Sequence, residues 1–320
     1  MLATLEQATE LINQGKYLHI AGCEELLAKL PKGKWIGGTT AYFISESGGM
    51  QTKEYLSVHE LSFAEEVRIA DYGKYNIFQI VEECYDHGFT TLILPFASEV
   101  AAKYAKEAPD VDELFLHPTA GWVAGYDYET VAPAKVFNGE TGKSFGDRAV
   151  VMYSKLPENK NVKINIINIF EEDKESPVIT FPENTMQVGK CFINGKEENF
   201  AEYIRRNRFN IQIPLISEYN GVYINTAVKS IGIFKVELCA PVFKGVEYRF
   251  AAPVANYEEV FRKKIEEARV GTPALSCNCI LNYMYGNLQG VKTPPFTGPV
   301  TFGEVAYQLM NQTLVYCEIV

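Results

Sequence analysis

The residues of this sequence that could contact a small ligand are concentrated in short stretches that combine glycine with polar or aromatic side chains. In Trp35-Ile-Gly-Gly-Thr-Thr40 the glycines let the backbone approach a ligand closely, and the hydroxyls can donate or accept hydrogen bonds. Gly121-Trp-Val-Ala-Gly-Tyr-Asp-Tyr128 combines aromatic rings with one carboxylate. Taken alone, each stretch is equally typical of a tight turn or a packed strand edge. The ligand contacts expected from them are Thr39, Thr40, Trp122, Tyr126 and Asp127.

Further stretches in the C-terminal part place polar side chains beside apolar ones. Ser276-Cys-Asn-Cys-Ile280 is typical of a buried strand, whose alternation puts the two thiols on one face and Asn278 on the other. Phe302-Gly-Glu304 sets one carboxylate among apolar neighbours. If buried, that carboxylate needs a partner or a raised pKa and would suit a ligand amine, whereas a solvated Glu at a helix start is the simpler alternative. The contacts expected here are Cys277, Asn278, Glu304 and Asn311.

One stretch is similar to a phosphate-binding loop but does not meet the sequence requirements of such a loop. Asn138-Gly-Glu-Thr-Gly-Lys-Ser144 contains the Gly-Lys-Ser end of such a loop, but the loop needs a glycine five positions before the Gly-Lys pair. Phe137 stands at that position, and the residues that follow lead into another strand rather than a helix. We therefore predict a hairpin turn at this place.

The cysteines and histidines do not favour a metal site. Zinc sites show paired ligands at short spacing, whereas the chain has no CxxC pair and its histidines are scattered. An enzyme that uses Cys277 or a threonine hydroxyl as nucleophile is an alternative, although such a nucleophile needs a nearby base. A haem-based gas sensor with a single axial histidine is a further alternative. The histidines are His19, His59, His87 and His117.

Composition limits the class of protein and of partner. Of the 320 residues, 47% are hydrophobic and 22% are charged, which is typical of a globular protein with a sizeable core. The net charge of -10 disfavours nucleic acid as a partner, because phosphate backbones attract basic faces. No signal peptide and no membrane-spanning run is expected, and seven cysteines without a pairing pattern fit a reducing cytosol. We therefore expect a cytoplasmic protein without membrane insertion.

Periodicity and capping residues predict a mixture of helices and strands along the chain. The helices are expected at residues 2–13, 24–30, 77–87, 98–106, 199–207 and 256–269. The clearest strands are expected at residues 55–63, 90–96, 148–153, 162–170, 221–225, 274–281 and 314–320. No linker rich in Pro, Gly or Ser divides the chain, so we expect two packed lobes that meet near Gly195.

Several ordered stretches together resemble a known family. They are Trp35 to Ala41, Gly121 to Asp127, Phe137 to Met152, Val188 to Ile204, Ser276-Cys277, Gly298 to Glu304 and Asn311 to Leu314. In order and spacing they resemble the elements of FIST domains. The closing pair, Gly298-Pro-Val-Thr-Phe-Gly-Glu304 and Asn311-Gln-Thr-Leu314, is the most specific part of this resemblance. It covers nearly the whole chain, from about Gly22 to Val320.

The chain also departs from that family at two places. The family has Gly-Glu where this chain has Tyr42 and Phe43, and it often has an Arg shortly after the Ser-Cys strand, where Ile280 to Tyr283 supplies none. Charged groups are thus replaced by apolar ones, which indicates a less charged pocket. The resemblance implies an intracellular ligand-sensing domain with an N-terminal and a C-terminal part, which binds small molecules such as amino acids. Some family members bind haem.

We therefore expect an α+β, or mixed α/β, fold of two intimately packed lobes, residues 1–195 and 196–320. Each lobe is expected to have mixed, largely antiparallel sheets with helices on the outer faces. The expected function is sensing of a small, amino-acid-like molecule in signal transduction, through a separate signalling protein because no output domain is present. No cofactor is expected. The alternatives are the enzyme, the haem sensor, and a scaffold that binds only another protein.

Overall fold

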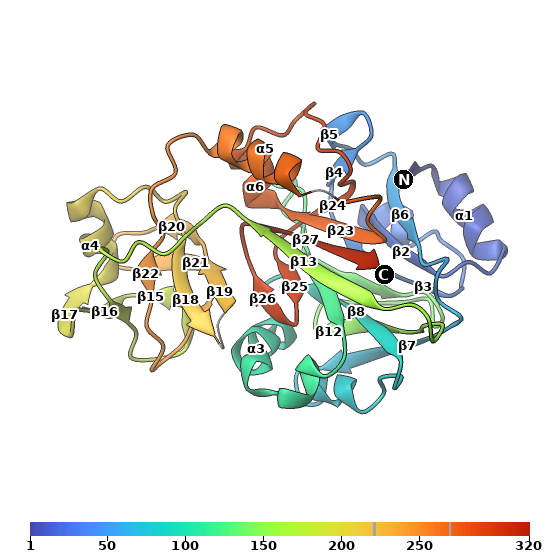
Figure 1. Ribbon diagram of the computed structural model, residues 1–320, viewed down its shortest axis with the longest axis horizontal. Coiled ribbons are helices and arrows are strands. Elements are labelled where there is room, and N and C mark those ends of the chain that lie inside the picture. Colours follow the sequence, from blue (N-terminus) through green and yellow to red (C-terminus); the bar gives the residue numbers. More distant parts are fainter. Residues whose placement is uncertain (220–221, 269) are drawn as a thin grey trace.

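The small lobe of this protein is inserted between two segments of a larger main body (Figure 1). The computed structural model describes residues 1–219, 222–268 and 270–320. The main body consists of residues 1–170 and 253–320 and contains three six-stranded sheets. The small lobe consists of residues 171–252 and contains three three-stranded sheets and one helix. Mixed sheets with helices packed on them confirm the expected α+β class.

Sheet 1 is formed mainly by the N-terminal part of the chain, and α1 (Leu5–Asn13) and α2 (Glu24–Leu27) cover its outer face. Thr4 caps α1, because its hydroxyl accepts a hydrogen bond from the backbone amide of Gln7 and the Gln7 side chain accepts one from the backbone amide of Thr4. Ala8 and Ile12 are buried against the sheet. The strands are, in order, β1 (Leu2–Ala3), β6 (Leu56–Glu60), β2 (Leu18–Gly22), β3 (Trp35–Thr39), β10 (Val136–Asn138) and β11 (Lys143–Phe145). The hairpin expected in place of a phosphate-binding loop is confirmed, because β10 pairs with β11.

Sheet 2 combines strands from the middle of the chain with two strands from its end. Helix α3 (Glu99–Glu107), capped by Ser98, covers its outer face together with the 3-10 helices η1 (Ile77–Val81), η2 (Ala108–Asp110) and η3 (Asp112–Phe115). The strands are, in order, β26 (Gln308–Met310), β25 (Glu304–Ala306), β9 (Thr119–Ala124), β8 (Gly88–Pro95), β12 (Arg148–Lys155) and β7 (Glu66–Gly73). Within it, β8 and β9 run parallel.

Sheet 3 contains the C-terminal strand at an internal position. Its strands are, in order, β13 (Val162–Asn168), β27 (Thr313–Ile319), β23 (Leu275–Cys279), β24 (Gly298–Thr301), β4 (Tyr42–Ser45) and β5 (Gly48–Gln51). Helices α5 (Tyr257–Glu267) and α6 (Ile280–Tyr285) cover its outer face. Because β27 pairs with β13 on one side and with β23 on the other, the expectation that the chain closes with a core strand is confirmed.

The inner faces of the three sheets meet in one apolar core. Strand β12 shows the alternation that produces it: Val150 and Met152 face this core, whereas Ala149 and Val151 face α3. Trp122 of β9 is 2% exposed and fills the centre of the core. The main body is therefore held together by burial of apolar surface between sheets, with helices outside.

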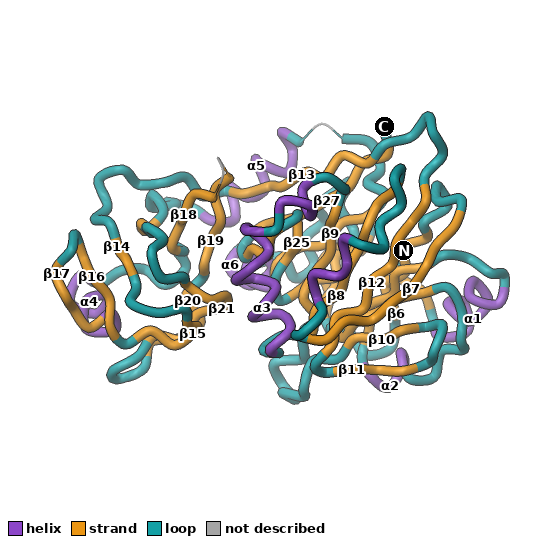
Figure 2. Tube along the Cα trace, turned by 90° about the horizontal axis from the view of Figure 1, so that it is seen from below, coloured by secondary structure: helices purple, strands orange, loops and turns teal. Residues whose placement is uncertain are grey.

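The small lobe has an apolar core of its own, built around Phe181, Phe200, Tyr248 and Phe250. It also contributes Ile216, Ala227, Ala240 and Ala251 to an apolar cluster of the main body. Helix α4 (Phe200–Asn207) packs on the lobe's own core and is capped by Asn199. The first sheet of the lobe contains β14 (Ile179–Thr180), β16 (Lys190–Ile193) and β17 (Lys196–Asn199). The second contains β15 (Thr185–Val188), β21 (Val236–Val242) and β20 (Val228–Ile231). The third contains β19 (Val222–Thr226), β18 (Leu215–Tyr219) and β22 (Arg249–Phe250). Figure 2 shows α3 and α6 at the boundary between the small lobe and the main body.

Three sequence expectations differ from the structure. The expected division at residue 195 falls in the turn between β16 and β17, inside the small lobe, because strands late in the chain return to sheets begun by its first half. The helix expected at 77–87 is only the 3-10 helix η1, since the chain must turn back before β8 starts at Gly88. The strand expected at 274–281 ends at Cys279, where α6 begins. Gly221 and Arg269, the ends of an expected strand and helix, lie outside the described residues.

Gly121 provides a test of the packing within sheet 2. A Cβ atom at this position would clash with the backbone carbonyl of Leu92 on the parallel neighbour β8. We expect Gly121→Ala to lower the free energy of unfolding by about 3 kcal/mol, because backbone cannot move aside as a flexible side chain can. Gly271→Ala is the matched control, since no atom lies within 4 Å of the added methyl group. Equal midpoints of denaturant unfolding for the two variants would contradict this packing.

Candidate ligand-binding site

A cavity of about 420 Å³ lies between the small lobe and the main body, and we call it the interlobe pocket. This volume is in the range of pockets that hold small organic ligands. The main body contributes Phe96, Tyr126, Tyr128, Cys279, Ile280, Leu281, Met284, Tyr285, Phe302 and Asn311, and the small lobe contributes Val228, Lys229, Ser230, Glu237 and Cys239. Of the residues expected from the sequence to contact a ligand, Tyr126 and Asn311 line this pocket.

Two pairs of parallel strands deliver residues to the interlobe pocket. Strands β8 and β9 run parallel, so Phe96 and Tyr126, which follow their carboxyl ends, emerge at the same edge of sheet 2. Strands β23 and β24 are likewise parallel, with Cys279 opposite Thr301, and Phe302 follows directly. Because carboxyl ends of parallel strands meet at one edge, residues distant in sequence converge on one wall.

That wall is aromatic. The rings of Tyr126 and Tyr128 lie 4.8 and 5.3 Å from the ring of Phe302, centroid to centroid, and Phe96 lies 5.2 Å from it. Tyr128 and Phe302 are stacked at 22°, whereas the other rings meet Phe302 edge to face. Such contacts hold the rings in fixed orientations, so the wall is preformed for a ligand with an apolar or aromatic body.

Asn311 is the polar side chain of the main body that remains unpaired in this pocket. It is fully buried, and among the described residues neither its amide nitrogen nor its amide oxygen has a hydrogen-bond partner. Its backbone carbonyl accepts a hydrogen bond from Asn225 of β19, at 3.2 Å. Gly303 lies beside the amide, where a Cβ atom would stand 3.3 Å from Nδ2. An unpaired buried amide destabilises the protein, and both polar atoms of this side chain are closed to solvent in the structure.

The small lobe presents an ion pair to the pocket. Lys229 Nζ lies 2.9 Å from Glu237 Oε1, and Ser230 Oγ donates to Glu237 Oε2 at 3.3 Å. Hydrogen bonding to Glu237 raises the pKa of Lys229, so its ammonium group stays charged at neutral pH. Lys229 Nζ also lies 5.8 Å from the ring centre of Phe96, a cation–π contact that crosses from the lobe to the main body.

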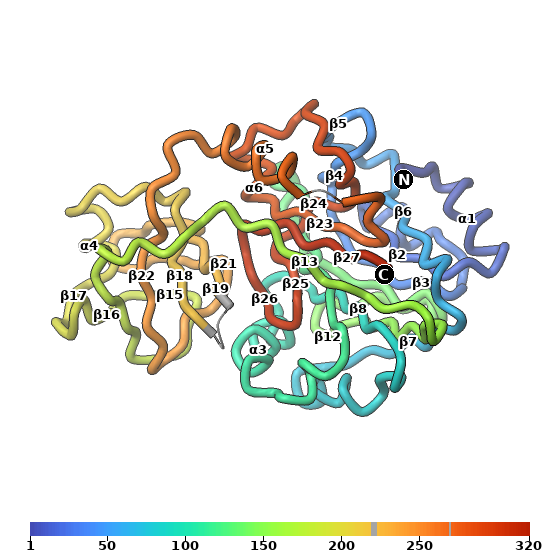
Figure 3. Tube along the Cα trace, in the orientation of Figure 1, coloured from blue at the N-terminus to red at the C-terminus, as the bar shows by residue number. Residues whose placement is uncertain are grey.

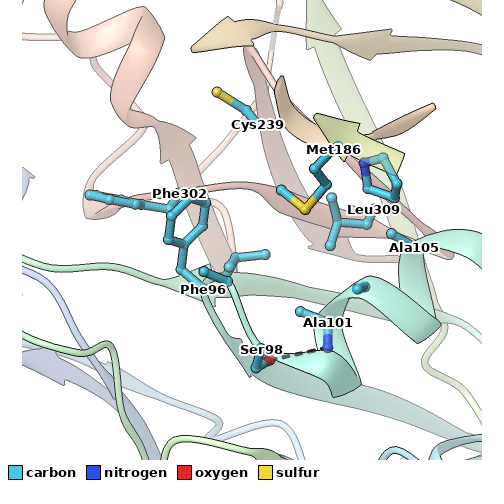
Figure 4. Close-up of a pocket in the computed structure, with 13 residues that line it drawn as sticks. Phe96, Ser98, Ala101, Ala105, Met186, Cys239, Phe302 and Leu309 are labelled. Atoms are coloured by element: carbon cyan, nitrogen blue, oxygen red, sulfur yellow. Dashed lines mark hydrogen bonds between the residues drawn. The ribbon is translucent and has the colours of Figure 1, made fainter. Parts of the chain in front are cut away.

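Beside the interlobe pocket the two parts touch through an apolar seam around a void of about 20 Å³ (Figure 4). Met186 and Cys239 of the small lobe face Ala101 of α3, Phe302 and Leu309 across it. Ser98 accepts a hydrogen bond from the amide of Ala101 and so fixes the start of α3 at this contact. The lobe is therefore packed closely at the seam and separated from the body at the pocket.

Glu304 is fully buried next to this site but belongs to the interior. Its carboxyl oxygens interact with the hydroxyls of Thr301 at 2.7 Å and Thr313 at 2.8 Å. Burial raises the pKa of Glu304 to about 8. The Thr301 hydroxyl also lies 3.3 Å from the carbonyl oxygen of Asn278, so it can donate there while it accepts the proton of a neutral Glu304. The alternative of a solvated Glu at a helix start is wrong.

Cys277, Asn278 and Trp122 also lie in the interior. Trp122 packs in the central core, and Cys277 donates to the carbonyl of Gly121 from that core, at 3.5 Å. Asn278 accepts a hydrogen bond from Asn282 through Oδ1, at 2.9 Å, and lines a void of about 10 Å³ with Cys277. Burial raises the pKa of the Cys277 thiol well above its usual range, the opposite of what a thiolate nucleophile needs.

Thr39, Thr40 and Asp127 come together at a second, smaller cavity of about 80 Å³, which Tyr126 also lines. Their polar groups are already paired: Thr39 donates to Gly125 O at 2.7 Å, and Thr40 donates to Val300 O at 2.7 Å. Asp127 accepts hydrogen bonds from Gln51 and the backbone of Glu129, and it forms a 2.6 Å ion pair with Lys53. These residues therefore stabilise turns.

The histidines offer no support for a metal or haem centre. His19 is buried and His59 is half-buried beside it, on β2 and β6, and desolvation lowers their pKa values to about 3 and about 4. His19 Nε2 pairs with the hydroxyl of Thr91 at 2.8 Å. Among the described residues, no histidine lines the interlobe pocket, and no three His, Cys, Asp or Glu side chains gather as metal ligands. Within the same residues, no helix has the length and apolar character needed to span a membrane.

Comparison with family models gives one match, over residues 3–320. The chain belongs to the family of unknown function DUF6976. No curated protein and no solved structure matches the chain. The resemblance to FIST domains stays a prediction, since the DUF6976 match does not refer to them.

Several lining residues of the pocket were not selected from the sequence. Tyr128 and Phe302 stand within the stretches that drew attention, and their aromatic character beside glycine was the available signal. Lys229, Glu237 and Cys239 could not be associated with Asn311, because they belong to the inserted lobe and only its docking brings them together. The spacing of residues in the sequence does not indicate how the lobe docks on the main body.

The unpaired amide of Asn311 predicts an unusual stability effect. We expect Asn311→Leu to raise the free energy of unfolding of the empty protein by about 1 kcal/mol, because it removes an unsatisfied buried polar group. Asn282→Leu is the matched control, since Asn282 accepts from Tyr257 at 2.6 Å and donates to Asn278 at 2.9 Å. The free energy of unfolding of that variant is expected to fall by about 2 kcal/mol. Denaturant unfolding measures both effects. Destabilisation by Asn311→Leu would contradict the conclusion that the Asn311 amide is unpaired.

The raised pKa of Glu304 predicts how stability depends on pH. Between pH 6.5 and 8 the folded carboxyl keeps a proton that the unfolded chain, with an ordinary value of 4.5, has released. The free energy of unfolding should therefore fall with rising pH, by about 1.4 kcal/mol per unit from this group. Glu304→Gln should remove this dependence while keeping the size of the side chain. Parallel pH profiles for wild type and variant would show that Glu304 ionises normally.

Proposed function

We propose that this protein senses a small organic molecule, which it binds in the interlobe pocket, and that it acts in signal transduction through a separate partner. The observation that carries this proposal is the pocket itself, a cavity of about 420 Å³ between the small lobe and the main body that has a preformed aromatic wall. A pocket of this size with few polar groups is typical of small-molecule sites. The ligand would contact both the main body and the small lobe.

The attachment of the small lobe supports a role in signalling. The chain passes between the two parts twice, after β13 and before α5 (Figure 3). The two crossing segments are joined by a bridge between Glu172 and Ala251 and by a 2.8 Å hydrogen bond from the amide of Ala252 to Glu171 O. A lobe with its own core on a paired hinge can turn as a unit. A ligand that binds one orientation better would shift the population towards it.

The contacts around Asn311 connect the pocket with that attachment. Asn225 of the small lobe donates to the carbonyl of Asn311, and Gln312 donates to the carbonyl of Gln212 in the lobe at 2.9 Å. Asn311, which borders the pocket, is therefore part of the contact that positions the lobe. A ligand in the pocket would lie beside this contact.

The enzyme alternative has less support from the same site. The two thiols of the pocket, Cys239 and Cys279, have pKa values raised by burial, that of Cys239 to about 12. Nucleophilic catalysis needs a thiolate or an adjacent base, and a raised thiol pKa is unfavourable to it. The haem alternative was expected to use an axial histidine, and among the described residues no histidine lines the pocket.

Mass spectrometry of the gently purified native protein tests the proposal, followed by denaturation and identification of any released molecule. We expect wild type to carry or acquire a ligand and Ser230→Trp to lose it, because the indole would fill the pocket from its rim. Ser47→Trp is the control, at an exposed position of the β4–β5 turn. In a thermal-shift screen, a ligand at a hundred times its dissociation constant should stabilise wild type by about 2.7 kcal/mol. An empty protein that no compound stabilises would favour a scaffold.

A further inference from the structure

We propose that the interlobe pocket binds an organic cation with a methylated ammonium group, which lies against the aromatic wall in place of the ammonium group of Lys229. This inference rests on the proposed function and specifies the ligand class of that site. It follows from side chains that border the cavity, namely the rings of the main body and the charged pair Lys229 and Glu237 of the small lobe.

The pocket already holds a positive charge against its aromatic wall. Lys229 Nζ lies over the ring of Phe96, 5.8 Å from the ring centre, and both side chains border the cavity. A cation within about 6 Å of an aromatic ring centre is attracted by the negative face of the ring. The face of Phe96 is therefore turned towards the lobe side of the cavity, and a cation occupies it in the structure.

Three further rings extend this wall, and they belong to Tyr126, Tyr128 and Phe302. The ring of Phe96 meets that of Phe302 at 74° and that of Tyr126 at 66°, and the rings of Tyr126 and Phe302 meet at 62°. A wall of mutually inclined rings is not a flat platform, so it suits a compact, rounded group better than a planar one. Clusters of aromatic rings are the usual recognition sites of methylated ammonium groups.

The charges around the cavity favour a cation over an anion. The side chain of Glu237 is 42% exposed and borders the cavity, so its carboxylate can pair with a ligand cation as well as with Lys229. The side chain of Lys229 is 36% exposed and flexible, so its ammonium group can turn into solvent and leave the face of Phe96 to the ligand. The net charge of -10 attracts cations to the protein as a whole.

The main-body side of the cavity favours a methylated ammonium over a primary one. A primary ammonium group is strongly hydrated and carries three N–H donors that need acceptors. Among the described residues, those of the main body that line the cavity are mostly aromatic or aliphatic and include no carboxylate. A methylated ammonium group presents apolar methyl groups to the rings while it keeps its charge, so it needs no hydrogen bonds from this side.

Replacement of Lys229 on the wall would change a contact between the two parts of the molecule. The contact of Lys229 with Phe96 crosses from the lobe to the main body. A ligand cation on Phe96 would break this direct contact and would itself connect the wall with Glu237 of the lobe. Binding would therefore favour the lobe orientation in which the ligand reaches both sides.

The test compares choline with 3,3-dimethylbutan-1-ol, which has the same shape but a carbon atom in place of the charged nitrogen. We expect wild type to bind choline about ten-fold more tightly than the neutral compound, as measured by calorimetry. Phe96→Leu should reduce this preference to about three-fold or less, because it removes the ring face. Both compounds are measured on the same sample, so their ratio does not depend on how much of the variant is folded.

Lys229→Met distinguishes a cation site from an anion site. We expect this variant to bind choline about three-fold more tightly than wild type, because the competing and repelling positive charge is gone. Lys235→Met is the matched control, since Lys235 lies in the turn between β20 and β21 but does not border the cavity. It should bind choline as wild type does. Weaker binding of choline by Lys229→Met would show that Lys229 holds the ligand, and would overturn the assignment of a cation.

The outcomes separate this inference from the proposed function. Equal binding of the two compounds to wild type, or no binding of choline, would overturn the methylated cation. Release of a neutral or anionic ligand in native mass spectrometry would do the same, while the pocket remains a binding site. The proposed function fails by a different result: a native protein that carries no ligand and that no compound of the thermal-shift screen stabilises.

Discussion

The turn at Asn311 and Gln312 is the constraint on which the rest of this structure depends. It carries the chain from β26 in sheet 2 to β27 in sheet 3, and so it joins two sheets whose inner faces share one core. Gln312 adopts a left-handed backbone conformation, with φ of 53°, which a non-glycine residue accepts only when its surroundings hold it there. Glu304 helps to stabilise this conformation, because its carboxyl group contacts both the backbone amide and the hydroxyl of Thr313, the residue after Gln312.

The same turn also positions the small lobe. Its two residues contact the lobe through the carbonyl of Asn311 and the amide of Gln312, which pair with Asn225 and Gln212. The turn thus connects three parts of the molecule by hydrogen bonds in a buried region, where an unmade bond is costly. The position of the small lobe is therefore linked to the packing of the two sheets through this turn.

Sequence reasoning was most successful where local chemistry decides the structure. The starts of α3 and α5 agree with the expected helices at 98–106 and 256–269, because Ser98 and Asn256 accept hydrogen bonds from the first turn of each helix. The first helix was expected from residue 2 but begins at Leu5, after the cap Thr4. The run after Thr313 was recognisable as a core strand because it is almost wholly apolar. The division of the chain was not recognisable, since residues 171–252 form a lobe by long-range pairing and no unusual composition marks its ends.

The candidate site shows the same limit at the level of single residues. Short glycine-rich stretches drew attention to Thr39, Thr40 and Asp127, but their polar groups are consumed by backbone atoms and neighbouring side chains. Asn311 has no glycine beside it in the sequence, and its two amide atoms have no hydrogen-bond partner among the described residues. The difference arises from geometry that spans the whole fold: parallel strands bring an aromatic wall to its side, and the inserted lobe closes the space opposite. Because folding normally pairs buried polar groups, the unpaired amide of Asn311 marks a place at the lobe contact where the interior is incompletely satisfied.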